Sequence, residues 1–254
     1  MQMPPKQTVV IDGQTLEYAR AGTGDPVIVL VNGSGGPIEG WMRVFEPLSA
    51  LGTVLAYNRP GIGRSGRPQV AQTGDAMVQA LRALLAALRL ASPYLLVGHS
   101  LGGLVVNLFA RRHPAEVAGV VMLEATAPED PAAMAALASS LQRGLQRLVD
   151  ALPGRSELAE TANTTQTVQA IAGAGKFPPV PLVVLSGGKP AMAWATPAAA
   201  LQARAEHQRR LATLSPLGTQ KIAPRSGHFP QLSEPEAVVD AVRHALRAAV
   251  VTVG

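Results

Sequence analysis

The stretch that decides the fold is Tyr94-Leu95-Leu96-Val97-Gly98-His99-Ser100-Leu101-Gly102-Gly103. Its apolar beginning predicts a buried strand that ends at Gly98, and apolar residues then recur at helical spacing until Pro114. A strand passes this quickly into a helix only through a very tight turn, in which side chains at the two flanking glycines would collide with the neighbouring backbone. We therefore interpret G-x-S-x-G as a turn that exposes a nucleophilic hydroxyl at Ser100, the alternative being a structural turn with an idle serine.

The composition fits one large domain and excludes several chemistries. A chain of 254 residues, 47% of them hydrophobic and 4% aromatic, suits a single α/β domain with an insertion and a core of Ala, Leu and Val. The absence of cysteine excludes disulfides, a thiolate nucleophile and a cysteine-ligated metal. The net charge of +5 comes with arginines that are scattered along the chain, which favours solvated helix faces over a nucleic-acid surface.

The sequence gives no sign of a membrane or secretory segment. The first residues lack the apolar run of a signal peptide, and no apolar stretch is long enough to span a bilayer. We therefore expect no membrane insertion and, by default, a cytoplasmic protein.

Strand and helix patterns alternate along most of the chain, which predicts a mostly parallel sheet with helices on both faces. The predicted strands, besides the one before Ser100, are Thr8–Ile11, Leu16–Ala19, Val27–Val31, Thr53–Tyr57, Val117–Leu123, Leu182–Leu185 and Thr219–Ala223. The predicted helices, besides the one after Ser100, are Trp41–Ser49, Thr73–Leu90, Pro197–Leu214 and Pro235–Val250. The first two strands flank Asp12-Gly13, a hairpin signal.

The alternation breaks between residues 125 and 181, where no strand is predicted. An apolar stripe at helical spacing runs through this segment: Met134, Leu137, Leu141, Leu145, Leu148 and Leu152. We predict a core domain of residues 1–124 and 182–254 with a helical cap at 125–181. Ligands of such sheets bind outside the carboxyl ends of the strands, so a cap that leaves from one of these ends is placed to act as a lid. The alternative is that the stripe only packs onto the domain.

The chain resembles proteins of the α/β-hydrolase fold from the first hairpin to the last helix. The resemblance rests on the Ser100 turn, the glycine loop after Val31, the loop Asn58–Ser65 and the run Ser226-Gly227-His228-Phe229. It implies the chain order nucleophile, acid, histidine. Two positions depart from the family, which usually has His at position 32 and Asp at position 58, whereas this chain has Asn at both.

A serine hydroxyl needs an adjacent base, and His228 is the candidate general base. It follows a predicted strand, in a loop that cannot be helical. His99 is expected to pack behind the turn. Three further histidines lie in or at the ends of predicted helices and are expected at the surface or in packing positions: His113, His207 and His244.

The candidate acid is Glu124. The resemblance would place an acid after the strand Leu182–Leu185, but Ser186-Gly187-Gly188-Lys189 contains no carboxylate. Some family members, including haloalkane dehalogenases, carry it after the preceding strand, where Glu124 stands. The alternative is an ordinary charged residue at a strand end. Two carboxylates follow shortly, Glu129 and Asp130, and Asp130 is expected to cap the next helix.

The backbone amides of Leu101 and Ser34 are the predicted oxyanion donors, one at the helix start and one in the loop after Val31. A serine at the turn excludes the aspartate-based route of dehalogenase and epoxide-hydrolase relatives. We expect a serine hydrolase that cleaves small to medium carboxylic esters through an acyl-enzyme, needing no metal or organic cofactor. The same residues also serve lactonases, C–C bond hydrolases, cofactor-free perhydrolases and hydroxynitrile lyases, and fold relatives act as non-catalytic binding proteins.

Overall fold

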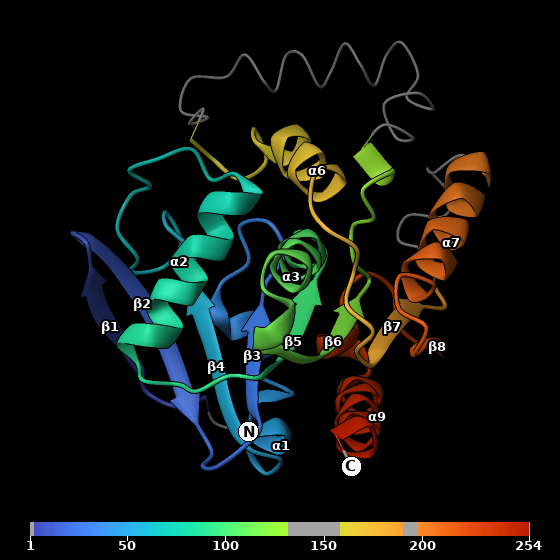
Figure 1. Ribbon diagram of the computed structural model, residues 1–254, viewed down its shortest axis with the longest axis horizontal. Helices are drawn as coiled ribbons and strands as arrows, with labels where there is room; N and C mark the ends of the chain where they lie inside the picture. Colours follow the sequence, from blue (N-terminus) through green and yellow to red (C-terminus); the bar gives the residue numbers. More distant parts are fainter. Residues whose placement is uncertain (1–2, 132–157, 190–197, 254) are drawn as a thin grey trace.

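The computed structural model describes residues 3–131, 158–189 and 198–253, which form one eight-stranded sheet with helices on both faces (Figure 1). The strand order is β1-β2-β4-β3-β5-β6-β7-β8; the pairs β1–β2 and β2–β4 are antiparallel and the others parallel. The strands are β1 (Lys6–Ile11), β2 (Gln14–Ala21), β3 (Val27–Val31), β4 (Thr53–Asn58), β5 (Tyr94–His99), β6 (Val117–Leu123), β7 (Leu182–Gly187) and β8 (Gly218–Ala223). The predicted fold class is confirmed.

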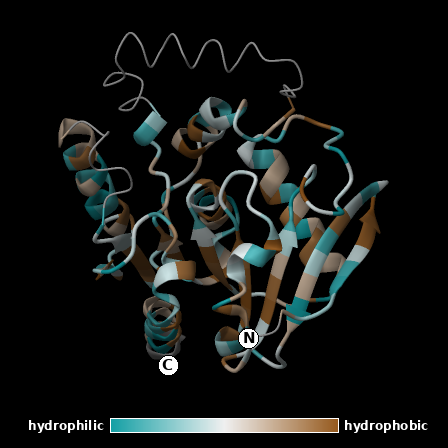
Figure 2. Ribbon diagram, turned by 180° about the vertical axis from the view of Figure 1, so that it is seen from behind, coloured by the Kyte–Doolittle hydropathy of each residue, from teal (hydrophilic) through white to brown (hydrophobic). Residues whose placement is uncertain are grey.

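Two hydrophobic clusters lie on opposite faces of the sheet. One face is covered by α2 (Gly74–Ala87), α3 (Leu101–Arg112), α6 (Thr164–Ala172) and α7 (Ala198–Ala212), and the other by η1 (Ile38–Trp41), α1 (Phe45–Ser49) and α9 (Pro235–Val253) (Figure 1). Each central strand supplies both clusters by alternation: Val29 belongs to the first and Ile28 to the second, and both are fully buried. This explains why the central strands are apolar at most positions, which are brown in Figure 2.

The helical elements of the described residues are η1 (Ile38–Trp41), α1 (Phe45–Ser49), α2 (Gly74–Ala87), α3 (Leu101–Arg112), η2 (Pro114–Glu116), α6 (Thr164–Ala172), α7 (Ala198–Ala212), α8 (Pro230–Ser233) and α9 (Pro235–Val253). The predicted helices are found near their predicted bounds with one exception, and η2, α6 and α8 are additional elements whose bounds the sequence does not predict. The exception is the helix predicted at Trp41–Ser49, which is split into η1 and α1. Pro47 cannot lie inside a helix, because it lacks an N–H group and its ring clashes with the carbonyl four residues earlier. The α-helix therefore begins only at Phe45, which places the proline in the first turn.

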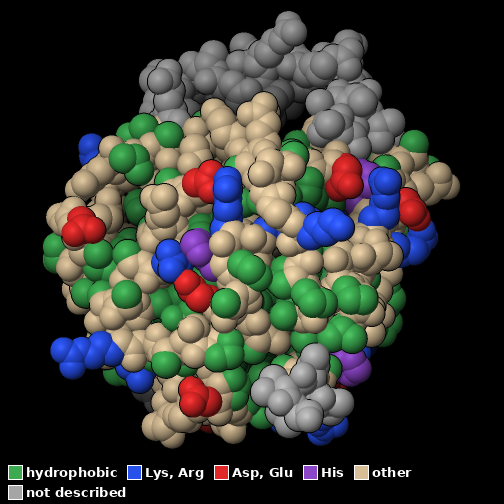
Figure 3. Space-filling view, viewed as in Figure 1, with side chains coloured by type: hydrophobic (Ala, Val, Ile, Leu, Met, Phe, Trp, Pro, Cys, Tyr) green, Lys and Arg blue, Asp and Glu red, His purple; other side chains and the backbone are tan. Residues whose placement is uncertain are grey.

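The segment predicted as a cap is described only at its two ends. The apolar stripe from Met134 to Leu152 lies outside the described residues. After it, the chain packs α6 against α2 and α3, with Ile171 of α6 buried in the first cluster. No helix in the described ranges is long and apolar enough to cross a membrane. Lysine and arginine side chains are scattered among acidic ones on the face seen in Figure 3.

Asn58 takes part in a buried network at the end of β4. Its Nδ2 donates to Oε2 of Glu17 at 2.7 Å, and its Oδ1 accepts from the amide of Ile38 at 2.8 Å. The Glu17 side chain is fully buried. Burial alone would raise the pKa of Glu17, but hydrogen bonds from Arg64 and Asn58 lower it to about 2. Glu17 thus supplies the negative charge here, and the neutral Asn58 is the partner that this charge requires.

We expect Asn58→Asp to destabilise the fold by about 3 kcal/mol at pH 8, because it sets two carboxylates in one buried network. The loss should be smaller at pH 4, where one carboxyl can hold a proton. Denaturant unfolding at both pH values measures this. The double variant Glu17→Gln/Asn58→Asp restores a single negative charge and should regain part of the stability. Equal stability of Asn58→Asp and wild type at pH 8 would contradict the account.

Candidate active site

Ser100 occupies a strained turn between β5 and α3. Its backbone angles are φ 51° and ψ −120°. Its amide donates to the Leu123 carbonyl at 3.1 Å, and its own carbonyl accepts from the amides of Gly103 and Thr126 at 2.8 and 3.0 Å. These bonds to the neighbouring strand and helix hold a conformation that a residue with a side chain rarely adopts.

The two flanking glycines are required by close backbone contacts. A Cβ atom at Gly98 would lie 2.5 Å from the carbonyl oxygen of Gly102. A Cβ atom at Gly102 would lie 2.2 Å from the carbonyl oxygen of Val31, in the strand that precedes the glycine loop. The turn, the helix start and the loop after β3 are therefore pressed together.

The amides of Leu101 and Ser34 lie beside this turn. Leu101 is the first residue of α3, where the N–H groups have no partner within the helix. Ser34 is exposed in the loop after β3. Its neighbour Gly33 lies against the Ser100 turn, since a Cβ atom at Gly33 would be 3.0 Å from Ser100 Cβ. Within the described residues, neither amide donates a hydrogen bond to another protein group.

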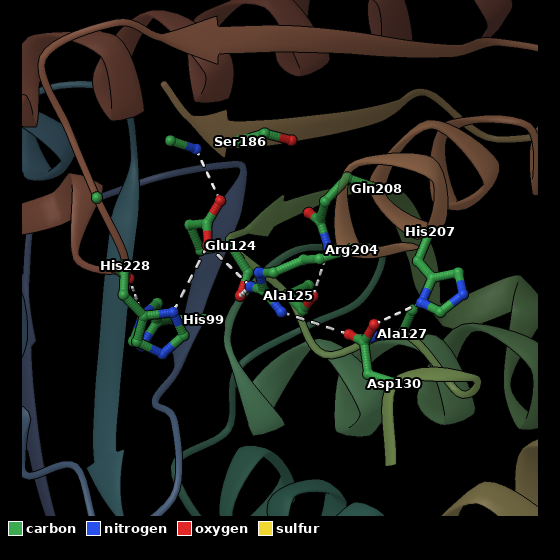
Figure 4. Close-up of polar contacts among 12 residues, drawn as sticks. His99, Glu124, Ala125, Ala127, Asp130, Ser186, Arg204, His207, Gln208 and His228 are labelled. Atoms are coloured by element: carbon green, nitrogen blue, oxygen red, sulfur yellow. Dashed lines mark hydrogen bonds and ion pairs between the residues drawn. The ribbon is translucent and has the colours of Figure 1, made fainter. Parts of the chain in front are cut away.

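His228 lies in the loop between β8 and α8, next to His99 of β5 (Figure 4). The ring centroids of the two histidines are 5.0 Å apart, and Nε2 of His99 lies 2.7 Å from the His228 carbonyl oxygen. Because a carbonyl only accepts, His99 carries its proton on Nε2. Burial lowers the pKa of His99 to about 4, against the raising effect of that hydrogen bond. His99 thus holds the His228 loop in place as a neutral donor, a role beyond the packing that the sequence predicted.

Glu124 follows β6 directly and points toward His228. Its Oε2 lies 3.6 Å from Nδ1 of His228, and its Oε1 accepts from the amide of Gly187 at 2.7 Å. The side chain of Glu124 is 10% exposed, and its backbone has a positive φ of 43°. This strained backbone conformation turns the carboxylate back over the end of the sheet toward the histidine.

Arg204 of α7 is a third partner of the Glu124 carboxylate. Its Nη2 donates to Oε2 of Glu124 at 2.8 Å and to the Glu124 carbonyl at 3.1 Å. Burial alone would raise the pKa of Glu124, but the contacts with His228, Arg204 and the Gly187 amide lower it to about 2. The carboxylate therefore stays ionised at neutral pH. Sequence reasoning missed Arg204, because no local pattern distinguishes it from the other arginines of this polar helix.

Asp130 lies on the other side of Arg204 and away from His228. Its Oδ1 is 2.6 Å from Nδ1 of His207, and its Oδ2 accepts from the Ala127 amide at 2.7 Å and lies 3.4 Å from Nη1 of Arg204 (Figure 4). The residues that a helix cap at Asp130 would contact lie outside the described ranges. The His207 side chain is buried at this contact. Glu129 makes no such contact with the described residues of the network.

A cavity of about 660 Å³ opens beside this network. Glu124 and His228 line one side, and Arg204 and Gln208 of α7 line another. The described residues contain no group of three or more acidic or histidine side chains that could hold a metal ion.

The chain is similar to known proteins in sequence and in structure. Residues 26–199 match the family model described as the alpha/beta hydrolase fold. The uncharacterized protein YqjL of Bacillus subtilis is 32% identical over 120 residues, which cover 47% of each chain. The 1-acylglycerol-3-phosphate O-acyltransferase ABHD5 of Rattus norvegicus is 30% identical over 114 residues, 43% of this chain and 32% of that protein. The matched region thus spans less than half the length of these curated relatives.

A solved structure extends the likeness to nearly the whole chain. The thermophilic esterase of Thermogutta terrifontis superposes with a TM-score of 0.63 at 24% identity, covering 98% of this chain and 99% of the esterase. At this identity the likeness establishes the fold alone.

We expect Arg204→Met to destabilise the fold at neutral pH and to flatten its loss of stability in acid. Glu124 has a folded pKa of about 2 against an ordinary value of 4.5, so it contributes stability above pH 4.5 that is lost as the pH falls toward 2. Without Arg204, burial is less opposed and the folded pKa of Glu124 rises toward its ordinary value, so the variant has less of this stability at neutral pH and loses less of it as the pH falls. At pH 7 the cost should be about 1–2 kcal/mol, because the arginine is one-third exposed.

Denaturant unfolding between pH 3 and pH 7 measures this effect. The control is Arg209→Met on the same helix, which removes an exposed ion pair with Glu206 and should cost less than about 0.5 kcal/mol at any pH. A pH dependence of Arg204→Met that parallels wild type would show that Arg204 does not stabilise the ionised carboxylate.

Proposed function

Because this chain belongs to the alpha/beta hydrolase fold family, we propose that it is a serine hydrolase that cleaves small to medium carboxylic esters. The proposal assigns Ser100 as nucleophile, His228 as general base and Glu124 as acid. The observation that carries it is that these residues converge at the carboxyl ends of neighbouring strands. There the strained turn places Ser100 after β5, and the Glu124 carboxylate lies 3.6 Å from Nδ1 of His228.

In the proposed reaction, the hydroxyl oxygen of Ser100 attacks the ester carbonyl while His228 takes the hydroxyl proton. The amides of Leu101 and Ser34 bind the oxyanion that forms. The tetrahedral intermediate collapses, His228 protonates the leaving alcohol, and an acyl-enzyme remains on Ser100. Water, activated by the same histidine, then attacks the acyl group and releases the acid.

Glu124 is suited to its proposed part because it is fixed and ionised. It would accept a hydrogen bond from Nδ1–H of His228, which leaves Nε2 as the basic nitrogen for the serine. It would also stabilise the imidazolium that forms. His99 does not compete as a base, because burial holds its pKa near 4 and its Nε2 proton is committed to the His228 carbonyl.

The bond that is cleaved follows less directly from these residues. Lactones, activated C–C bonds and peracids react through the same groups, so a hydrolysis panel should include lactones and vinylogous diketones beside esters of graded acyl length. A non-catalytic binding protein is the other alternative, and stoichiometric labelling by a fluorophosphonate probe would exclude it. We also propose that residues 125–181 form the cap over the core domain of residues 1–124 and 182–254.

Ser100→Ala should lower ester hydrolysis by about a million-fold, because the acyl-enzyme can no longer form. The fold should remain intact, since the change removes only one hydroxyl from a partly exposed residue. Initial rates on p-nitrophenyl acetate and a thermal unfolding curve measure the two effects. Near-normal turnover by a well-folded variant would refute the assignment of the nucleophile.

Glu124→Gln should cut kcat by a thousand-fold or more, because an amide cannot stabilise the imidazolium. Asp130→Asn is the matched control, since Asp130 lies on the same side of the sheet and also contacts Arg204, but is paired with His207 instead of His228. It should stay within about tenfold of wild type. Steady-state kinetics on one ester compares the two variants, and the reverse ranking would identify Asp130 as the functional carboxylate.

A further inference from the structure

The loop after β3, residues 32–36, is held by two charged side chains from distant parts of the chain. Arg59, just after β4, donates from Nη1 to the Asn32 carbonyl at 2.7 Å and from Nη2 to the Gly33 carbonyl at 2.6 Å. Glu160, before α6, accepts from the Gly35 amide at 2.5 Å. The two side chains meet, with Nε of Arg59 2.5 Å from Oε2 of Glu160.

These contacts fix the direction of the Ser34 amide. A trans peptide is planar, so its C=O and N–H groups point in opposite directions. The Gly33 carbonyl is bound by Arg59 and also accepts from the Gly36 amide at 3.1 Å. The N–H of Ser34 belongs to the same peptide and therefore points away from Arg59. A flip of this peptide would break both bonds.

Burial makes the two side chains depend on one another. Arg59 is 2% exposed and the Glu160 side chain 11%. Tyr57, in the adjoining strand, cannot supply a compensating charge, because burial raises its pKa to about 12. An arginine this deeply buried needs a counter-charge, and Glu160 is the carboxylate that contacts it. The expectation that the arginines lie on solvated faces is thus wrong for Arg59.

We propose that Arg59 and Glu160 are positioning residues that hold the Gly33–Ser34 peptide with its N–H turned toward the oxyanion site. The inference rests on the proposed function for its effect on catalysis, whereas the orientation of the peptide is testable in the resting protein. It also gives the second half of the segment 125–181 a defined task, because Glu160 links it to the loop beside Ser100.

The kinetic test uses Arg59→Lys and Glu160→Gln. Lysine keeps the charge but cannot span two carbonyls, and glutamine keeps an acceptor for the Gly35 amide but leaves the arginine without a counter-charge. For p-nitrophenyl acetate we expect kcat to fall 10- to 100-fold with KM within threefold, because an oxyanion donor acts in the transition state. Arg82→Met, which removes the exposed pair with Glu116, is the control and should leave both constants unchanged.

A second measurement separates loop orientation from general destabilisation. The amides of Gly35 and Gly36 are bound to Glu160 and to the Gly33 carbonyl, so their hydrogen exchange reports on the loop. In both variants we expect these amides to exchange at least tenfold faster than in wild type, while amides of β5 and β6 keep their rates. Either variant is sufficient if the other fails to fold.

The outcomes are distinct. Faster loop exchange together with the fall in kcat supports the proposal. Unchanged loop exchange, or faster exchange with an unchanged kcat, overturns it. If wild type cleaves no ester of the panel and takes no fluorophosphonate label, the proposed function fails. The exchange rates alone then decide whether Arg59 and Glu160 hold the peptide: faster exchange supports that role and unchanged exchange refutes it.

Discussion

The close contact between the Ser100 turn and its surroundings is the constraint on which the rest of this structure depends. A positive φ at a non-glycine residue costs about 1–3 kcal/mol and persists only where neighbouring groups determine it. Here the Leu123 carbonyl, the Thr126 amide and the absent side chains of Gly98 and Gly102 do so together. The turn therefore requires β6 on one side and the loop after β3 on the other. Glu124 directly follows β6 and Ser34 lies in the loop after β3, so the contacts that hold the strained turn also position the residues of the candidate site.

A second theme is the pairing of buried carboxylates with arginines at the ends of strands. Glu17 is bound by Arg64, Glu124 by Arg204 and Glu160 by Arg59. Each carboxylate also accepts a hydrogen bond from a backbone amide, namely that of residue 64, of residue 187 at the end of β7, and of residue 35. A carboxylate that is removed from water needs several donors to remain charged, and a single arginine does not supply them all. These three clusters tie loops at one end of the sheet to one another, which local backbone bonds could not do.

The sequence predicted what local patterns encode. Apolar runs located the strands, flanking glycines located the Ser100 turn, and the position of Glu124 directly after β6 made it the candidate acid. The contacts of Arg204, His207 and Glu160 could not be predicted, because they join residues far apart in the chain; Arg59 and Glu160 are 101 positions apart. Periodicity places a residue on a face of an element but does not name its partner. The same limit applies to His99, whose buried position was expected but whose bond to the His228 carbonyl was not.

The position of the candidate acid follows from the space around β7. The resemblance to hydrolases placed an acid after that strand, yet a Cβ at Gly187 would lie 2.4 Å from the Gly227 carbonyl oxygen, and one at Gly188 would lie 2.8 Å from Pro224 Cα. The loop that carries His228 thus leaves no room for an aspartate at position 187 or 188. Strand β6 lies one spacing away, about 4.8 Å, and glutamate is one methylene longer than aspartate. Glu124 reaches across this distance, and the Gly187 amide binds its carboxylate. The end of β7 therefore still serves the candidate acid, as a hydrogen-bond donor in place of a side chain.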